Sequence, residues 1–200
     1  MRALTWAGVA LGLALLTAVL HGSAVGGGWR FDDAPHLQFV ATYSPWQYFG
    51  VREVMLRQSY AHITPWNALF YEIGLPWFGL DARGHHVHLL VVLWATALAS
   101  FALLQRWLHV VPALAGAVLF LAMPPTAVVG QLLMTGHYAY GLLFSVLSLH
   151  CFAGTLQRSG ARPAWLAAFF YALACLCKEL YVPLVLVTLA LPLADVRARL

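Results

Sequence analysis

Two neighbouring acids follow the first long apolar run of this chain, in the stretch GGGWRFDDAPHLQF at residues 26–39. Carboxylates held side by side repel each other, so one tends to keep its proton while the other serves as a base or a cation ligand. The glycine-rich GGGW lets the backbone turn sharply before Asp32 and Asp33, and we expect the apolar loop that follows to cover them. The competing interpretation is a pair of solvated loop residues, since Asp is usually exposed.

A second charged pair, Lys178 and Glu179, interrupts a long apolar stretch near the end of the sequence. Charges in such a stretch are energetically costly and normally functional. As adjacent residues they point in different directions on a helix and need not pair with each other. A lysine at a membrane boundary suits a phosphate group, as a point charge that needs no bidentate geometry. The alternative is a simple turn whose lysine extends toward the membrane surface.

The histidines raise the question of a metal site. The stretch GHHVH places His85, His86 and His88 at the start of an apolar run. Histidine ligands on a helix prefer a spacing of three or four residues, so His85 and His88 could share a face whereas His86 could not. We therefore expect packing and hydrogen bonding rather than a metal ion. His36, His62 and His137 fall on the same predicted side, and the secondary site candidates are His36, His85, His88 and His137.

The composition indicates a membrane protein. The 200 residues are 62% hydrophobic and 9% charged, with a mean hydropathy of +0.78. Soluble domains carry about 25% charged residues, so one globular core could not absorb this deficit. The net charge of +4 comes from basic residues scattered singly, which argues against nucleic acid as a partner. Cys151, Cys175 and Cys177 lie in apolar runs and are predicted to pack as small hydrophobes.

Six apolar runs are candidates to cross the roughly 30 Å hydrocarbon layer as helices. We interpret the first as an uncleaved helix rather than a signal peptide. The last two are continuous except for Lys178 and Glu179, where we expect the chain to reverse. The sequence thus predicts an all-α polytopic membrane protein with a single membrane domain over residues 1–200. The runs are 3–21, 86–104, 108–123, 138–156, 163–177 and 180–194.

The arginines predict the orientation, because basic residues in short connections stay on the cytoplasmic side. Arginine occurs in Met1-Arg2 and in the connections 105–109, 157–162 and 195–200, which places both termini in the cytoplasm of a multi-pass protein of the cell membrane. Both charged pairs then face the exterior.

A first exterior loop, residues 22–85, is too long to be a structureless connection. It contains two helix-compatible stretches rich in Trp and Tyr, at 45–60 and 64–80, with prolines near their starts. Trp and Tyr favour the headgroup level, so we predict two short interfacial helices along the membrane surface.

Several stretches occur in an order that resembles a known family. They are DD after the first helix, LPWFGLDARGHHVHLL at 75–90, FLAMPPTAVVGQLLMTGHYAYGLLF at 120–144 and ALACLCKELYVPLVL at 172–186. Together they resemble the GT-C superfamily of membrane glycosyltransferases, in the branch of protein O-mannosyltransferases and aminoarabinose transferases. The resemblance implies a transfer of sugar from a polyprenyl-phosphate donor to a hydroxyl of a protein, lipid or glycan acceptor at the exterior face.

The resemblance also assigns roles to residues. Asp32 takes the position of the general base and Asp33 that of a second candidate, while Lys178 and Glu179 take the donor-phosphate site. It implies no certain cofactor and leaves a divalent cation open. The stretch TGHYAY at 135–140 departs from relatives that carry an Arg-Asp pair there. The chain is also shorter than the family's usual length, so we expect an N-terminal portion that works with a C-terminal partner or the remainder of a longer chain.

Two other functions remain open at the level of sequence. A transporter or channel subunit could line an ion path with the same charges, although no inverted repeat is visible in the sequence. A non-catalytic membrane partner could keep the GT-C-like fold without the chemistry.

Overall fold

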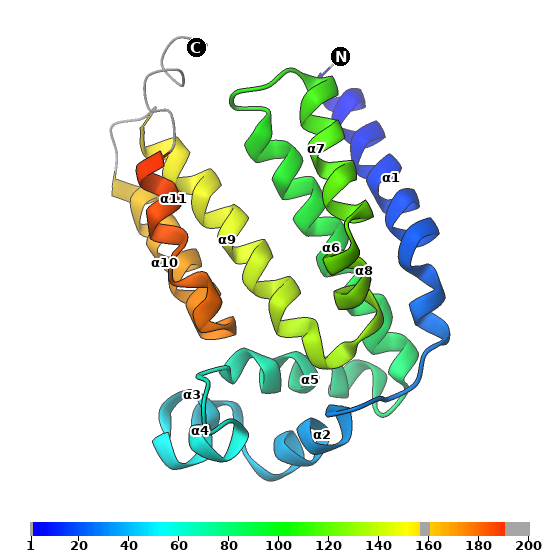
Figure 1. Cartoon of the computed structure of the whole chain (residues 1–200), viewed down its shortest axis with the longest axis vertical. Coiled ribbons are helices and arrows are strands. Elements are labelled where there is room, and N and C mark those ends of the chain that lie inside the picture. Colours follow the sequence, from blue (N-terminus) through cyan, green and yellow to red (C-terminus); the bar gives the residue numbers. More distant parts are fainter. Residues whose placement is uncertain (1, 157–160, 191–200) are drawn as a thin grey trace.

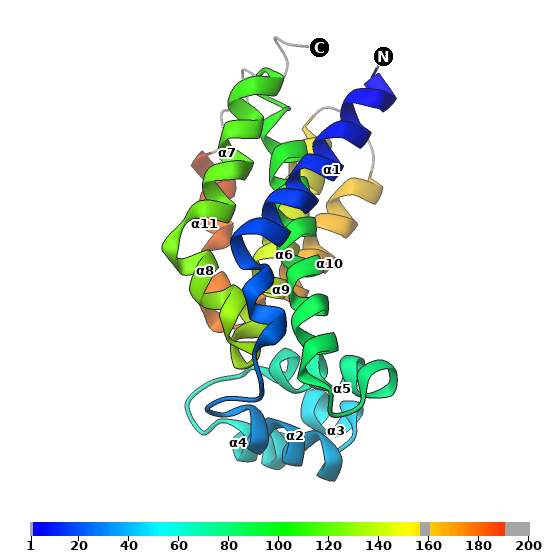
Figure 2. The same cartoon turned by 90° about the vertical axis from the view of Figure 1, so that its right-hand side faces the viewer.

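The structure, a computed structural model, describes residues 2–156 and 161–190 of the chain. In these residues every regular element is an α-helix or a 3-10 helix, as predicted. Long helices run side by side as a bundle, and a layer of shorter helices closes one end of it (Figures 1 and 2). We call this end, which contains α2 to α5, the loop end.

The long helices alternate in direction through the bundle. α1 runs toward the loop end, α6 runs away from it, and the later helices continue the alternation (Figure 1). α11 runs in the direction opposite to α10 and contacts α9, so the chain reverses at Lys178 and Glu179 as predicted. The bounds are α1 Arg2–His21, α6 Ala82–Leu104, α7 Val110–Ala122, α8 Pro124–Gln131, α9 Gly136–Thr155, α10 Ala161–Cys177 and α11 Leu184–Ala190, with 3-10 turns at Gly22–Gly26, Leu133–Thr135 and Glu179–Tyr181.

Three of the described helices are long and apolar enough to cross a membrane, namely Thr5–Gly26, Ala82–Leu104 and Leu133–Thr155. The pair α7 and α8 makes a fourth if it is counted as one span bent by 53°. The other two predicted spans correspond to the shorter apolar helices α10 and α11. Residues 191–194 of the last predicted run lie outside the described residues. The helices therefore indicate a membrane protein with three to four candidate spans in the described part.

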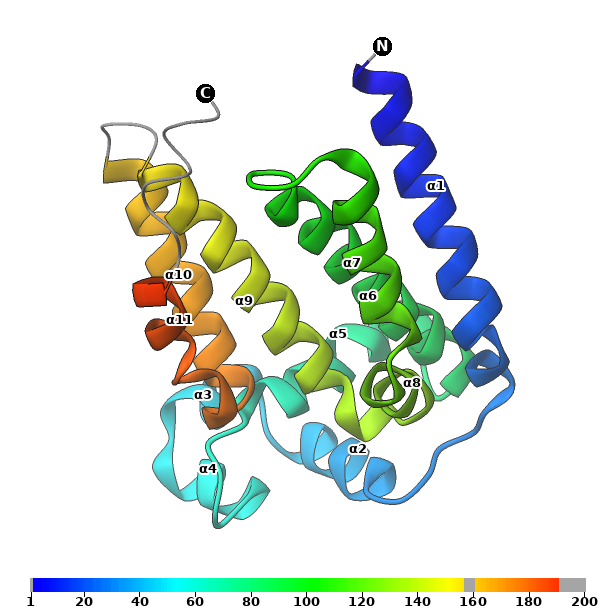
Figure 3. The same cartoon turned by 45° about the horizontal axis from the view of Figure 1, so that its top comes forward.

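A proline pair causes the bend between α7 and α8. Met123 ends α7 in an extended conformation (φ −71°, ψ 141°), and Pro124 opens α8. The ring of a proline clashes with a helical conformation of the residue before it, so a helix normally stops at that point. In Figure 3, α7 is seen along its length whereas α8 is seen almost end-on.

The loop end contains four helices where the sequence predicted two. The first predicted stretch divides into α3, Pro45–Gly50, and α4, Arg52–Gln58, because Val51 is extended directly after the poor helix former Gly50. The second stretch forms α5, Pro65–Phe78, and begins at its proline as expected. A further helix that was not predicted, α2, Asp33–Thr42, begins at the acidic pair itself.

Helix α5 lies across the loop end of the bundle and packs against α2, α3, α6, α9 and α10. Its buried side chains join Tyr48 and Leu89 in an aromatic-rich core. Two glycines allow the close approach of α5 to its neighbours. A Cβ atom at Gly74 would overlap the buried ring of His85 on α6, and one at Gly136 of α9 would lie 2.9 Å from the ring of Phe70. The loop layer is therefore anchored to the bundle through contacts that leave no spare volume.

We expect Gly74→Ala to destabilise the protein by about 1–3 kcal/mol, because an added methyl group in a filled core forces its neighbours to move. The His85 ring has little freedom to move, since it is buried and its Nε2 bonds the Gly79 carbonyl at 3.1 Å. Thermal unfolding in detergent, followed by circular dichroism, measures the effect. Gly12→Ala is the control: its Cβ meets open space, so helix propensity should leave stability equal or slightly raised. Equal melting temperatures for parent and Gly74→Ala would contradict the tight contact.

Candidate functional site

The two adjacent acids occupy different environments. Asp33, the first residue of α2, is only 1% exposed, and its carboxylate accepts two hydrogen bonds. The Tyr71 hydroxyl donates to Oδ1 and the Arg30 backbone N–H donates to Oδ2, both at 2.6 Å. Asp32, one residue earlier, is exposed at the N-cap of α2. Asp33 is thus saturated by protein donors, while Asp32 presents its carboxylate to the outside.

The chain turns at Phe31, directly before the two acids. Phe31 is exposed and has φ 49°, a left-handed conformation that costs a non-glycine residue about 1–2 kcal/mol. Among the glycines in the described part, only Gly79 has a positive φ. The glycines of GGGW thus use no positive φ, and Gly27 is extended (φ −73°, ψ 154°). Gly27 instead permits a close approach, because its Cβ would lie 2.8 Å from the Ala24 carbonyl and 3.1 Å from His86.

His36 lies one helical turn after Asp32 and belongs to the same cluster. The Asn67 side-chain amide donates to its Nε2 at 2.9 Å, and its ring stacks on Tyr71 at 5.5 Å. Burial lowers the pKa of His36 below its ordinary 6.5, although the negative charges of Asp32 and Asp33 partly oppose this. Burial and the hydrogen bond to Asp33 raise the pKa of Tyr71. At neutral pH the pair therefore consists of a neutral imidazole and a protonated phenol that donates to Asp33.

Lys178 and Glu179 do pair with each other, in contrast to what their adjacency suggested. Lys178 is extended just after α10 (φ −165°), and its Nζ lies 3.5 Å from Glu179 Oε1. His62 Nδ1 lies 2.5 Å from the same oxygen. The Lys178 side chain is 13% exposed and that of Glu179 is 48% exposed. Glu179 therefore links the connection between α4 and α5 to the end of α10, and it neutralises part of the lysine charge.

His137 is a secondary candidate within Coulombic range of Lys178, Glu179 and His36. It is buried in the first turn of α9. His36 in turn interacts with Asp32 and Asp33. All of these residues lie at the loop end of the bundle, where α1 ends and α6 begins (Figure 2). The structure thus brings together the acids, the Lys-Glu pair and two of the secondary candidates.

The remaining two secondary candidates are packed into the core. His85 is fully buried beside Trp29, with ring centroids 4.9 Å apart, and it bonds the Gly79 carbonyl. His88 stacks on Phe70 at 5.3 Å, and its Nε2 lies 2.5 Å from the Tyr140 hydroxyl. Neither ring faces the acidic pair as a free ligand. In the residues that the structure describes, no three His, Cys, Asp or Glu side chains are grouped to hold a metal ion.

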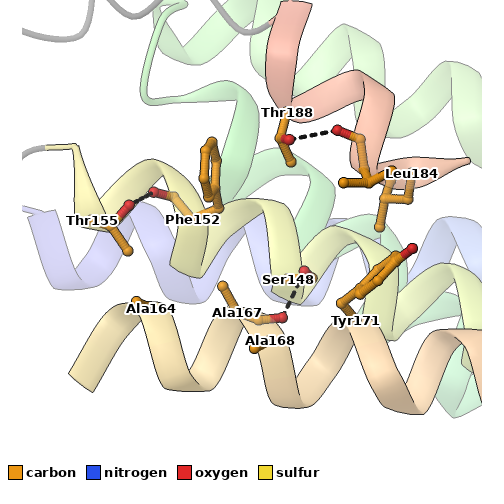
Figure 4. Close-up of a pocket in the computed structure, with 10 residues that line it drawn as sticks. Ser148, Phe152, Thr155, Ala164, Ala167, Ala168, Tyr171, Leu184 and Thr188 are labelled. Carbon is orange, nitrogen blue, oxygen red and sulfur yellow. Dashed lines mark hydrogen bonds between the residues drawn. The ribbon is translucent and has the colours of Figure 1, made fainter. Parts of the chain in front are cut away.

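An apolar groove of about 640 Å³ runs from the Glu179 end along α10. Its walls are Ala61 and Ile63 on the loop side and Ala172, Cys175 and Leu176 on α10. Tyr171 also lines a second cavity of about 270 Å³ between α9, α10 and α11 (Figure 4). The hydroxyl of Ser148 in that cavity donates to the Ala167 carbonyl, so it offers no free polar group there. Both spaces suit a hydrocarbon chain.

Sequence reasoning missed His62, Asn67 and Tyr71 as members of this site. The sequence placed His62 on the same predicted side as Glu179 but gave no sign that the two are partners, since they lie more than a hundred residues apart. Asn67 and Tyr71 are four residues apart in a helix-compatible stretch, so they share a face of α5. That spacing was a usable signal, but nothing in the sequence indicated that the face meets α2.

No protein-family model, no curated protein and no solved structure matches this chain. The likeness to GT-C glycosyltransferases therefore stays a prediction, and a functional proposal has to rest on the residues and their geometry.

We expect Tyr71→Phe to lower the free energy of unfolding by about 1.5–3 kcal/mol, because it removes a hydrogen bond to a buried carboxylate. Chemical or thermal unfolding in detergent measures the loss. Tyr60→Phe serves as the matched control, since Tyr60 is 90% exposed and should tolerate the change. In a double-mutant cycle with Asp33→Asn, the two losses should not add. Additive losses would mean that the hydroxyl and the carboxylate do not interact.

Proposed function

We propose that this protein transfers a sugar from a polyprenyl-phosphate donor to an acceptor hydroxyl at the loop end, with Asp32 as the general base. The observation that carries the proposal is the exposed carboxylate of Asp32 beside the saturated carboxylate of Asp33, at the same end of the bundle as Lys178. A base must be reachable by the proton it removes, and only Asp32 of the pair meets this condition.

The reaction needs one proton transfer and one displacement. Asp32 takes the proton of the acceptor hydroxyl while its oxygen bonds to the anomeric carbon of the sugar. The bond from that carbon to the phosphate oxygen breaks, and the polyprenyl phosphate leaves with the electron pair. Attack opposite to the leaving group inverts the configuration at the anomeric carbon. The ammonium group of Lys178 stabilises the negative charge that develops on the leaving phosphate.

The surroundings of Lys178 support this role. Glu179 and His62 hold the segment after α10 in place, and the lysine keeps 13% of its side chain exposed. The groove along α10 begins at Glu179 and is lined mostly by apolar side chains. A polyprenyl chain would gain about 25 cal/mol for each Å² of apolar surface buried there. Its phosphate would then lie at the Lys178 end of the groove.

Asp33 supports Asp32 rather than replacing it in this proposal. Its two hydrogen bonds fix the first turn of α2, which begins directly after Asp32. The Phe31 turn and the buried Asp33 leave the Asp32 backbone little freedom. A base held in place before the reaction loses no entropy when substrate arrives.

We further propose that six segments cross the membrane, with both termini in the cytoplasm and the loop end at the exterior face. The alternating directions of the helices and the arginines of the short connections support this orientation. In it, α10 and α11 are short spans, and helices α2 to α5 lie at the outer surface.

The orientation predicts the outcome of reporter fusions. Alkaline phosphatase needs disulfides and is active only outside the bacterial cytoplasm. A fusion after Gly136, at the loop end, should be active, whereas a fusion after Gly160 should be inactive. Immunoblots should show both fusions at equal levels. The reverse pattern of activity would place the proposed site on the cytoplasmic face.

Asp32→Asn should reduce sugar transfer by about 10²- to 10⁴-fold, because the amide keeps the size of the carboxylate but cannot accept the proton. Transfer from a radiolabelled polyprenyl-phosphate sugar, in membranes with matched expression, measures the loss. Donor binding and melting temperature should stay close to those of the parent, since Asp32 is exposed. Asp33→Asn should instead lower the melting temperature together with the activity, because its carboxylate holds two buried hydrogen bonds.

Near-normal transfer by Asp32→Asn would exclude that residue as the base. Normal transfer by both single variants and by the double variant would overturn the glycosyltransferase mechanism and favour a non-catalytic membrane partner.

A further inference from the structure

A cavity with a polar wall lies at the opposite end of the bundle from the acidic pair. It measures about 500 Å³ and lies between the connection after α6, the last turns of α9 and the first turn of α10. Its polar wall contains Arg106, His150 and Arg162, and its apolar wall contains Pro163 and Leu166. None of these residues takes part in the chemistry proposed above.

The guanidinium of Arg106 has a defined place in this cavity. Its Nη2 donates to His150 Nε2 on α9 at 3.0 Å. It also packs beside Gly154 of α9, where a Cβ atom would lie 3.7 Å from it, an ordinary van der Waals distance. Arg162, from α10, lines the same space and is exposed. Two guanidinium groups, one from the connection after α6 and one from α10, thus border one cavity.

The charges of the described residues are distributed unevenly between the two ends. Every Asp and Glu in the described part lies in residues 32–81 or at position 179, all at the loop end. The N-terminus of α10, a helix of 17 residues, adds a partial positive charge beside Arg162. The field in the cavity is therefore positive and favours an anion.

The position of the cavity along the helices indicates which anion reaches it. Arg106 follows the end of the candidate span Ala82–Leu104 by two residues, and His150 lies in the last turns of Leu133–Thr155. Trp165, one turn into α10, is 76% exposed, as expected for a side chain at the headgroup level. The cavity thus opens where lipid headgroups lie, and Leu166 beside it offers an apolar surface to an acyl chain.

We propose that this cavity binds the phosphodiester headgroup of an anionic membrane phospholipid, with Arg106 and Arg162 as its ligands. The planar guanidinium group can donate to two phosphate oxygens at once. This favours arginine over lysine for holding a phosphate that remains bound. Basic pockets between membrane helices are a known way of holding such headgroups. The proposal concerns a site separate from Asp32 and Lys178, and its test does not involve sugar transfer.

The test uses the purified protein in nanodiscs of phosphatidylcholine that contain increasing fractions of phosphatidylglycerol. Native mass spectrometry counts the lipids that stay bound after release from the disc. The parent should retain phosphatidylglycerol in preference to phosphatidylcholine. Arg162→Gln should weaken this retention about fivefold, as expected for one basic side chain near a membrane surface. The double variant Arg106→Gln/Arg162→Gln should weaken it further, to about 30-fold if the two effects add.

The matched control is Arg52→Gln/Arg57→Gln, which removes two exposed charges at the loop end and should leave retention unchanged. Arg162 is exposed, so its single variant keeps the test decisive even if the Arg106 variant does not fold. Equal retention of the two lipids by the parent, or unchanged retention by Arg162→Gln, would overturn the proposal. An equal loss in the control would show a general charge effect in place of a site. Displacement of the lipid by inorganic phosphate alone would mean that the cavity takes a soluble phosphate.

Discussion

The loop end of this protein depends on one buried hydrogen bond, between the Tyr71 hydroxyl and the Asp33 carboxylate. A carboxylate that is 1% exposed is stable only when donors replace the water it has lost. Tyr71 supplies one donor and the Arg30 backbone supplies the other. The bond joins residues 38 positions apart and so fixes α2 against α5. Where Asp32 points, and which groups it can reach, both follow from this link.

Helix α5 can hold the site because one of its faces carries both the contacts to the site and close contacts to the bundle. Asn67, Phe70, Tyr71 and Gly74 follow the spacing i, i+3, i+4 and i+7, and all four are buried. That spacing places them in a single stripe along a helix. Within the stripe, Asn67 bonds His36 and Tyr71 bonds Asp33, while Phe70 and Gly74 meet α9 and α6 at close range. The residues that position the candidate base are therefore the same ones that attach the loop layer to the bundle, so a change in one function disturbs the other.

The sequence predicted the features that depend on local residue patterns, such as the helices. It did not predict the features that depend on contacts between residues far apart in the chain. Long apolar runs predicted helices, and Lys178 with Glu179 predicted the reversal between α10 and α11. Alternation of direction then predicted that the acids, His137 and the Lys-Glu pair share one end. The sequence did not show that Gly27 permits a close approach to His86, or that Phe31 is the residue with a positive φ. The bond from His62 to Glu179 and the contact of α5 with α2 were beyond reach, because nothing in a single sequence pairs residues so far apart.

The two ends of the bundle differ in the cation that each offers to a phosphate, and the difference matches what each end is proposed to do. At the loop end the cation is Lys178, a point charge already shared with Glu179 at 3.5 Å. Such a group can stabilise charge that develops during a reaction without holding the ground state so tightly that the product cannot leave. At the opposite end the cations are Arg106 and Arg162, of which Arg106 is fixed in place by His150. The several N–H donors of a guanidinium group held in place bind a phosphate tightly. Tight binding suits a lipid that remains bound, but it would slow the departure of a leaving phosphate. If both proposals hold, the lysine at the loop end suits a phosphate that must depart and the arginines at the opposite end suit a phosphate that stays bound.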